Sequence, residues 1–261
     1  MFTLADQPQS IGKVLDSGFR LYGAGFKKFI GLAALYAVTM IVPALFVPVQ
    51  SQPPGPPDFA RVRLFGALVL VMIPVYIFFY AALLYRIGMF AQSNDPGFAD
   101  ALKRGLRCVI PALVSSVLAM LAIAGGIIAL VIPGLILMVG LFFSTFAIVL
   151  DGTGPVASLR RSFNLVWGNW WRTAAIMTVA LVVVMVFSFG VKVLPLVVVA
   201  IMRPDVSVLW LVRVITEAIA NAVVTPLMWA MLVVHYYDLK LRKEGHDLEE
   251  RLSGVAVRAP A

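Results

Sequence analysis

Residues 109–150 read VIPALVSSVLAMLAIAGGIIALVIPGLILMVGLFFSTFAIVL, a run of 42 residues without Asp, Glu, Lys, Arg or His. As one helix this run would measure roughly 63 Å, about two hydrocarbon thicknesses of a bilayer. It must therefore fold back on itself. Pro133-Gly134 is the predicted turn, because a turn at Gly125-Gly126 would leave a first arm too short to span. The stretch predicts a hairpin of two transmembrane helices.

The rest of the chain has the same character, since residues of the class AVILMFWYC make up 61% of it and charged residues only 13%. A soluble domain could not bury so much apolar surface. Four more runs lack charged residues and are about as long as a membrane crossing requires: Phe29–Pro57, Leu64–Tyr85, Thr173–Val191 and Ala218–Val234. The sequence predicts an all-α integral membrane protein with six transmembrane helices at about 29–49, 64–90, 109–131, 134–151, 171–200 and 210–238.

Six spans place both termini on one side of the membrane. That side carries 16 of the 21 Lys and Arg residues, so the positive-inside rule predicts that both termini are cytoplasmic. The first 28 residues hold six charged side chains and no apolar segment, and a cleavable signal peptide is therefore not expected. The basic charges belong to no recognisable nucleic-acid-binding motif, and anionic lipid headgroups are the expected partners.

A similar amphipathic segment precedes each predicted hairpin: IGKVLDSGFRLY at 11–22, FADALKRGLR at 98–107 and PVASLRRSFNLVW at 155–167. Helical spacing separates an apolar face from a charged face in each, which is typical of a helix lying in the plane of the headgroups. We expect three such in-plane helices on the cytoplasmic side, and three units at 10–90, 96–151 and 155–238. Internal duplication and a shared lipid constraint both remain open as explanations. One membrane domain, residues 1–250, and a flexible tail, 251–261, are expected.

Two groups of residues are candidate sites. The first combines cations and aromatic rings at the cytoplasmic edge, where they could bind anionic lipid or a membrane-protein partner: Arg104, Arg107, Arg160, Arg161, Trp167, Trp170, Trp171 and Arg172. The second group shares one face of the last helix at i, i+4 and i+8: Arg213, Glu217 and Asn221. It is either an ion pair at the outer edge or the mouth of a pathway or pocket.

The sequence offers no catalytic apparatus. It lacks the dinucleotide, phosphate-loop, zinc-protease and serine-hydrolase motifs. Cys108 is the only cysteine, and the two histidines, His235 and His246, lie at the end of the last span, so no metal and no cofactor are expected.

Three segments resemble a known family: VLDSGFRLY at 14–22; VIPGLIL at 131–137 with VLDGTGPVASLRRSFNLVWGNWWR at 149–172; and HYYDLKLRKEGHDLE at 235–249. They are similar to bacterial membrane proteins related to the membrane domain of glycerophosphoryl diester phosphodiesterase. The resemblance implies a six-helix bacterial inner-membrane domain, which some relatives fuse to a soluble phosphodiesterase. A catalytic barrel needs about 250 residues and is absent, so no phosphodiesterase residue is assigned.

The first functional hypothesis is a non-enzymatic inner-membrane protein that binds or organises anionic lipid or a membrane partner at its cytoplasmic face. A small-solute or lipid transporter or channel is the alternative, with Arg213, Glu217 and Asn221 at its outer mouth. An intramembrane lipid enzyme comes third, because no paired carboxylates or histidines converge at one depth.

Overall fold

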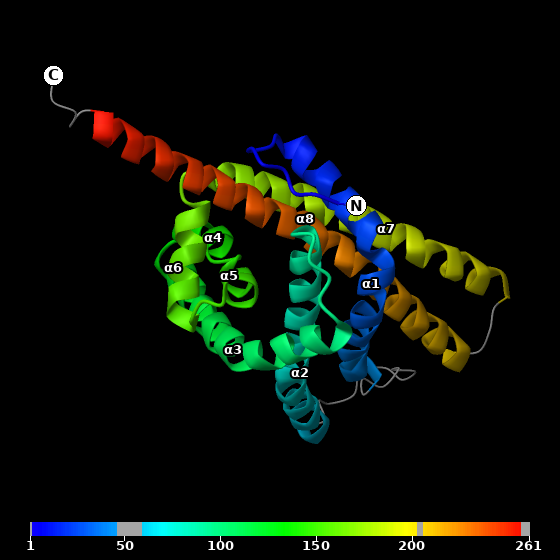
Figure 1. The fold of residues 1–261 in the computed structure, drawn as a ribbon. Helices are drawn as coiled ribbons and strands as arrows, with labels where there is room; N and C mark the ends of the chain where they lie inside the picture. The colour runs from blue at the N-terminus through cyan, green and yellow to red at the C-terminus, as the bar shows by residue number, and fades with distance from the viewer. Residues whose placement is uncertain (1, 46–58, 203–205, 257–261) are drawn as a thin grey trace.

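The computed structural model describes residues 2–45, 59–202 and 206–256, and within these ranges it is helical without any strand (Figure 1). The eight helices follow one another as α1 (Ile11–Leu45), α2 (Phe59–Ala91), α3 (Phe98–Ala129), α4 (Val131–Gly140), α5 (Ser144–Asp151), α6 (Pro155–Val166), α7 (Trp170–Met202) and α8 (Val206–Ala256). The end of the first predicted span, residues 46–49, and tail residues 257–261 lie outside the described part. Tail residues 251–256 belong to α8.

Among the described residues, six segments are long and apolar enough to cross a membrane, in agreement with the predicted number. They are Ile11–Val42, Val62–Ala91, Phe98–Ala129, Val131–Asp151, Trp170–Val193 and Val208–Lys243. The first and third begin earlier than predicted, because the amphipathic segments at 11–22 and 98–107 continue without a break into α1 and α3. Of the three segments expected to form separate helices, only the third does so, as α6.

The turn between the third and fourth spans lies at Leu130, three residues before the predicted Pro133-Gly134. Leu130 is extended, with φ −165° and ψ 142°, while Pro133 falls in the first turn of α4, where a missing backbone N–H costs no helical hydrogen bond. Gly134 instead lets the two helices approach closely, since a Cβ on it would lie 2.8 Å from the backbone nitrogen of Ile127. The predicted position of the turn was therefore wrong, and Gly134 contributes to the packing of the hairpin instead.

The fourth span is not one helix. A three-residue turn at Leu141–Phe143 divides it into α4 and α5. The carbonyl of Gly140, which ends α4, accepts a hydrogen bond of 2.7 Å from the buried Ser162 hydroxyl of α6. A backbone group near the end of a helix thus finds a partner in a neighbouring helix.

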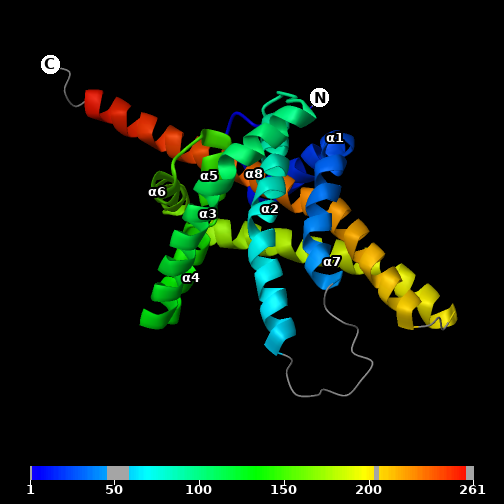
Figure 2. The ribbon, with the colours of Figure 1, turned by 90° about the horizontal axis from the view of Figure 1, so that it is seen from below.

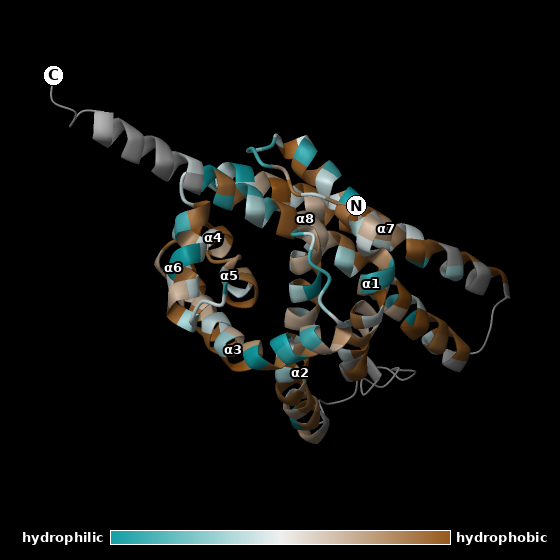
Figure 3. Ribbon diagram, in the orientation of Figure 1, coloured by the Kyte–Doolittle hydropathy of each residue, from teal (hydrophilic) through white to brown (hydrophobic). Residues whose placement is uncertain are grey.

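The termini and the α2–α3 connection lie at one end of the molecule, which we call the terminal end, and the α3–α4 turn lies at the other (Figure 2). Hydrophobic residues dominate along α2 and α7, while hydrophilic residues gather on the α2–α3 connection and on α6 (Figure 3). Large apolar side chains far along the spans are exposed, among them Ile128 at 85% and Phe189 at 71%. Surfaces of this kind suit contact with lipid tails.

The second arm of each hairpin contributes an aromatic ring to the centre of the molecule. The ring of Trp229 in α8 lies 4.7 Å from that of Tyr80 in α2 and 6.1 Å from that of Phe146 in α5. A completely buried alanine follows each of these rings in the sequence: Ala81, Ala147 and Ala230. The small side chains leave room for the aromatic rings to meet.

The three amphipathic segments bury the same register positions. The residue before the aligned leucine is fully buried in every copy, and four positions later a small residue is buried in turn: Val14 and Gly18, Ala101 and Gly105, Ser158 and Ser162. Each small residue meets the second arm of another hairpin. A Cβ on Gly18 would come within 2.7 Å of the Met231 Cα in α8, and one on Gly105 within 2.7 Å of the Phe78 carbonyl oxygen in α2.

Candidate functional site

The α6–α7 turn holds the three predicted tryptophans. Gly168 has φ +90°, a conformation that side-chain-bearing residues rarely adopt, and it allows the chain to reverse between the two helices. Trp167 and Trp171 are 59% and 81% exposed, whereas Trp170 is half-buried and donates from its indole nitrogen to the Ile136 carbonyl. Residues 167–172 line an open depression of about 490 Å³. Two exposed aromatic rings at a helix turn suit the headgroup region of a bilayer.

Arg104, a predicted lipid ligand, is bound within the protein. Its guanidinium donates to the carbonyl oxygens of Ile148 and Val149 at 2.9 to 3.2 Å. These carbonyls belong to the last turn of α5, where the helix dipole favours a cation. The Ile148 carbonyl also accepts from the backbone N–H of Gly152, which caps the helix. Arg104 therefore joins α3 to the end of α5.

Arg161, another predicted ligand, belongs to a cluster centred on Asp151. The carboxylate accepts hydrogen bonds from the Arg161 Nε at 2.5 Å, the Tyr236 hydroxyl at 2.7 Å and the Lys240 Nζ at 3.0 Å. Burial lowers the pKa of the Arg161 guanidinium, but hydrogen bonding with Tyr236 and the charge of Asp151 outweigh burial and raise it. The Asp151 cluster, which the sequence did not reveal, joins α5 and α6 to α8.

Arg172 enters a second cluster, centred on Asp238, whose side chain is only 3% exposed. Asp238 accepts from Arg172 and Arg242 at 3.0 Å each, and from the backbone nitrogen of Gln9 at 2.7 Å. Both arginines also donate to the Gln9 carbonyl oxygen. The Asp238 cluster thus fastens the N-terminal segment to α7 and α8.

Next to this cluster lies the completely buried His235. Its Nε2 is 3.2 Å from the Thr173 hydroxyl, and its Nδ1 has no hydrogen-bond partner in the described structure. The Phe143 ring packs against the imidazole at 5.7 Å. The surroundings are those of a core residue, and among the described residues no group of three or more His, Cys, Asp and Glu could hold a metal ion.

Arg107 and Arg160 differ from the other three predicted arginines. Both are exposed, and neither forms an ion pair or hydrogen bond with any described residue. Arg107 lies between Leu106 and Ile110 of α3, which are 68% and 73% exposed. Arg160 shares the outer face of α6 with Val156, 57% exposed and one turn earlier. The predicted group thus divides into three structural arginines and two available ones.

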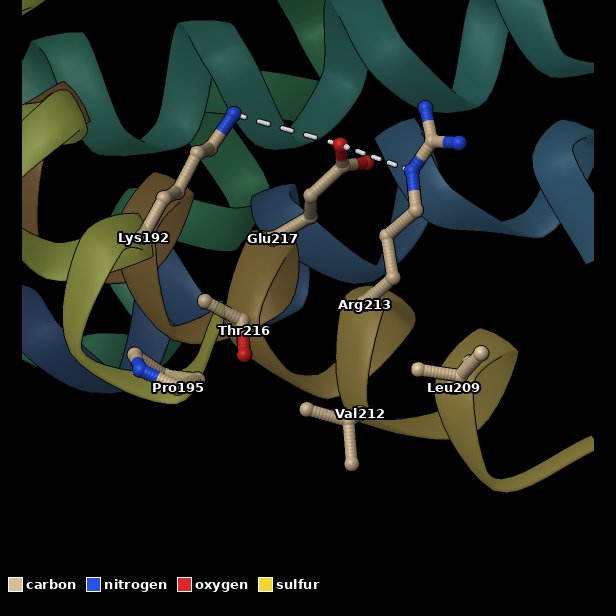
Figure 4. Close-up of a pocket in the computed structure, with 7 residues that line it drawn as sticks. All are labelled: Lys192, Pro195, Leu209, Val212, Arg213, Thr216 and Glu217. Atoms are coloured by element: carbon tan, nitrogen blue, oxygen red, sulfur yellow. Dashed lines mark ion pairs between the residues drawn. The ribbon is translucent and has the colours of Figure 1, made fainter. Parts of the chain in front are cut away.

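Two members of the second predicted group, Arg213 and Glu217, line a groove between α7 and α8, about 380 Å³ in volume (Figure 4). The Glu217 carboxylate is 3.6 Å from the Arg213 Nε and 3.9 Å from the Lys192 Nζ. Lys192, which belongs to α7, is not a member of the predicted group. Asn221 does not line the groove, and its side chain donates to the backbone carbonyl of Glu217 at 2.8 Å.

Sequence signals could have revealed part of these sites. Asp238 and Arg242 have the i, i+4 spacing of a helical ion pair. Their contacts with Gln9 and Arg172 join distant parts of the chain, and no local pattern indicates them.

Comparison with known proteins identifies a family for this chain, and the description of that family names no activity. The profile of a family described as "Domain of unknown function (DUF7847)" matches residues 64–239, more than half of the chain. No curated protein and no solved structure matches the chain. The matched segment begins in α2 and ends in α8, and it contains the α6–α7 turn, the α7–α8 groove and the two central carboxylates, Asp151 and Asp238. The cluster members Gln9, Lys240 and Arg242 lie outside it.

Proposed function

The chain belongs to this DUF7847 family, and we propose that it is a non-enzymatic inner-membrane protein that binds anionic lipid headgroups at its terminal end. Arg107 and Arg160 supply the free cations, and Trp167 and Trp171 supply interfacial rings. The observation that supports the proposal most directly is that the five candidate arginines fall into two classes, bound and exposed. Arg161 and Arg172 pair with carboxylates and Arg104 donates to backbone carbonyls inside the fold, while Arg107 and Arg160 remain exposed beside apolar side chains.

The surroundings of Arg107 favour a lipid ligand over a soluble one. Leu106 and Ile110 flank it on the outer surface of α3, a segment apolar enough to cross a membrane. An arginine in such a position extends along apolar surface and keeps its guanidinium at the headgroup level. A phosphate there would receive bidentate hydrogen bonds from a group that has no competing partner.

The orientation and the in-plane segments form part of the proposal. We infer that the terminal end is cytoplasmic, because it carries most of the Lys and Arg residues. In this arrangement α6 and the first turns of α1 and α3 lie at the headgroup level. The separate α6, with Arg160 outside and Ser158 and Ser162 inside, supports this placement.

We also propose that the three units arose by duplication. The common burial register and the aromatic-alanine pairs of the second arms support it. The contacts follow a cyclic order as well, because the amphipathic segments of the first, second and third units pack on α8, α2 and α4. A lipid constraint on amphipathic helices would explain their composition, but it would not explain this order.

Relationship to the membrane domain of glycerophosphoryl diester phosphodiesterase stays a hypothesis. The motifs quoted from the sequence support it, and the family match gives no link to that domain. A bacterial inner membrane as the location depends on the same resemblance.

Lipid binding by the arginines is tested with purified protein that is mixed with phosphatidylglycerol in neutral detergent. We expect the double variant Arg107→Ala with Arg160→Ala to retain less of this lipid, with a loss of about 2 kcal/mol, at ~1 kcal/mol per basic residue. That loss corresponds to roughly a thirtyfold weaker affinity. High salt should weaken binding to the wild type more than to the variant.

Two control variants make the result specific. Arg63→Ala removes an exposed cation of α2 that donates to the Phe59 carbonyl of its own helix, and lipid retention should not change. Arg161→Ala should lower the unfolding temperature, because Asp151 loses a partner. Unchanged retention in the Arg107 and Arg160 double variant would remove the proposal and leave a protein partner as the ligand of this face.

Transport remains the second candidate. The groove at Lys192, Arg213 and Glu217 is the feature that favours it, because ionisable residues on spans often line substrate pathways. Solute flux through reconstituted vesicles, lost in Glu217→Gln, would support transport over lipid binding alone.

A further inference from the structure

The groove between α7 and α8 has two chemically different sides. Figure 4 shows the charged groups of Lys192, Glu217 and Arg213 gathered along one side, while Pro195, Val212 and Leu209 lie on the other. Its volume of about 380 Å³ is within the usual range for ligand pockets. A ligand that fills it must combine a polar group with an apolar one.

The charges in the groove favour an anion. Two cations face one carboxylate, which leaves a net charge of +1. Both N···O separations exceed the length of a hydrogen bond, and among the described residues neither Lys192 nor Arg213 donates a hydrogen bond. Their N–H groups are thus free to bind a further oxygen acceptor, and a phosphate suits the guanidinium geometry.

The position of the groove favours a lipid over a soluble anion. Lys192 follows Arg172 by 20 residues along α7, roughly 30 Å of helical rise, or about one membrane thickness. Before Lys192 on α7, Val186 and Phe189 are 64% and 71% exposed, and Ile219, which follows Glu217 on α8, is 53% exposed. An anion whose apolar chains extend over these side chains would gain hydrophobic contact as well as charge neutralisation.

We propose that this groove binds the phosphate of an anionic phospholipid at the membrane interface opposite the terminal end. Lys192 and Arg213 hold the phosphate, the acyl chains extend over Val186, Phe189 and Ile219, and Glu217 competes with the phosphate for the two cations. The apolar side of the groove, Pro195, Val212 and Leu209, lies nearer the end of α7 and the start of α8. This site is independent of Arg107 and Arg160, which lie near the other end of the molecule.

Competition by Glu217 gives the proposal a characteristic test. Delipidated full-length protein in neutral detergent is titrated with dioctanoyl phosphatidylglycerol, and bound lipid is counted by native mass spectrometry. Removal of the competing carboxylate in Glu217→Gln should strengthen binding severalfold. The double variant Lys192→Ala with Arg213→Ala should weaken it about tenfold. Dioctanoyl phosphatidylcholine, which has no net charge, should respond to neither change.

Measurements on the Arg107→Ala with Arg160→Ala double variant separate this site from the one at the terminal end. In that background Glu217→Gln should still strengthen binding, so the two proposals can fail independently. Weaker or unchanged binding in Glu217→Gln, with a lower unfolding temperature, would mean that the three charges are a structural ion-pair group, and it would overturn the proposal. Displacement of the lipid by equal concentrations of inorganic phosphate or of a fatty acid would overturn the choice of phospholipid.

Discussion

Asp238 holds two arginines and a backbone amide while being almost inaccessible to solvent. In Asp238→Asn the two guanidinium groups would lose their counter-charge inside the protein. Breaking a buried ion pair in this way costs about 3 kcal/mol. The expected result is an unfolding temperature in detergent that is lower by more than about 5 °C.

Asp16→Asn provides the matched control for this prediction. Asp16 pairs with Arg20, but the two side chains are 59% and 71% exposed, so loss of the pair should leave the unfolding temperature nearly unchanged. Equal effects in the two variants would mean that the Asp238 cluster does not stabilise the fold.

At the scale of single residues, the sequence did not reveal which of the candidate arginines are bound inside the protein. The sequence grouped Arg104, Arg161 and Arg172 with Arg107 and Arg160, and it could not distinguish the arginines that are bound within the protein from the two that are exposed. The difference depends on acceptors that are distant in sequence, such as Val149 for Arg104, 45 residues away. Helical periodicity shows which residues share one face of a helix, but it does not show which hydrogen-bond acceptors of a neighbouring helix lie against that face.

At the scale of elements, Gly134 tests the packing of the α3–α4 hairpin. An alanine Cβ would lie closer to the Ile127 backbone than real Cβ atoms do, so the two helices must separate in Gly134→Ala. We expect a destabilisation of about 1 to 3 kcal/mol, as for overpacked cores. Thermal unfolding in detergent measures it.

A second glycine of the same hairpin is the control. Gly125 has open space around the position of a Cβ, so Gly125→Ala should be neutral, or stabilising by up to about 1 kcal/mol through helix propensity. If Gly134→Ala proved as harmless as Gly125→Ala, the close approach of α3 and α4 would be refuted.

The charge-free runs of the sequence predicted the number of spans but not every helix boundary. Charge-free runs predicted the six spans, because each must bury its backbone polar groups in its own helical hydrogen bonds. The same runs could not show the interruption at Leu141–Phe143, since LFF contains neither proline nor glycine. That break accompanies the hydrogen bond from Ser162 to the Gly140 carbonyl, a tertiary contact.

At the scale of the whole molecule, the orientation can be tested with a membrane-impermeant maleimide on intact cells. Cys108, the only native cysteine, is 3% exposed and should give little background. With a cytoplasmic terminal end, a cysteine introduced as Leu130→Cys at the α3–α4 turn should be labelled, and one introduced as Ser93→Cys should not. The reverse pattern would invert the orientation and place the basic face outside the cell.

The hydrogen bonds of Asp238 and Arg242 with Gln9 join residues that the ribosome synthesises far apart in time. The partners of these contacts are separated by 229 and 233 positions in the chain. At bacterial or eukaryotic elongation rates this separation corresponds to roughly 10 to 50 s of synthesis. Until α8 emerges, Gln9 lacks its contacts with Asp238 and Arg242 and can bind only Arg172 of α7, so the amino-terminal segment is fully fastened late in synthesis.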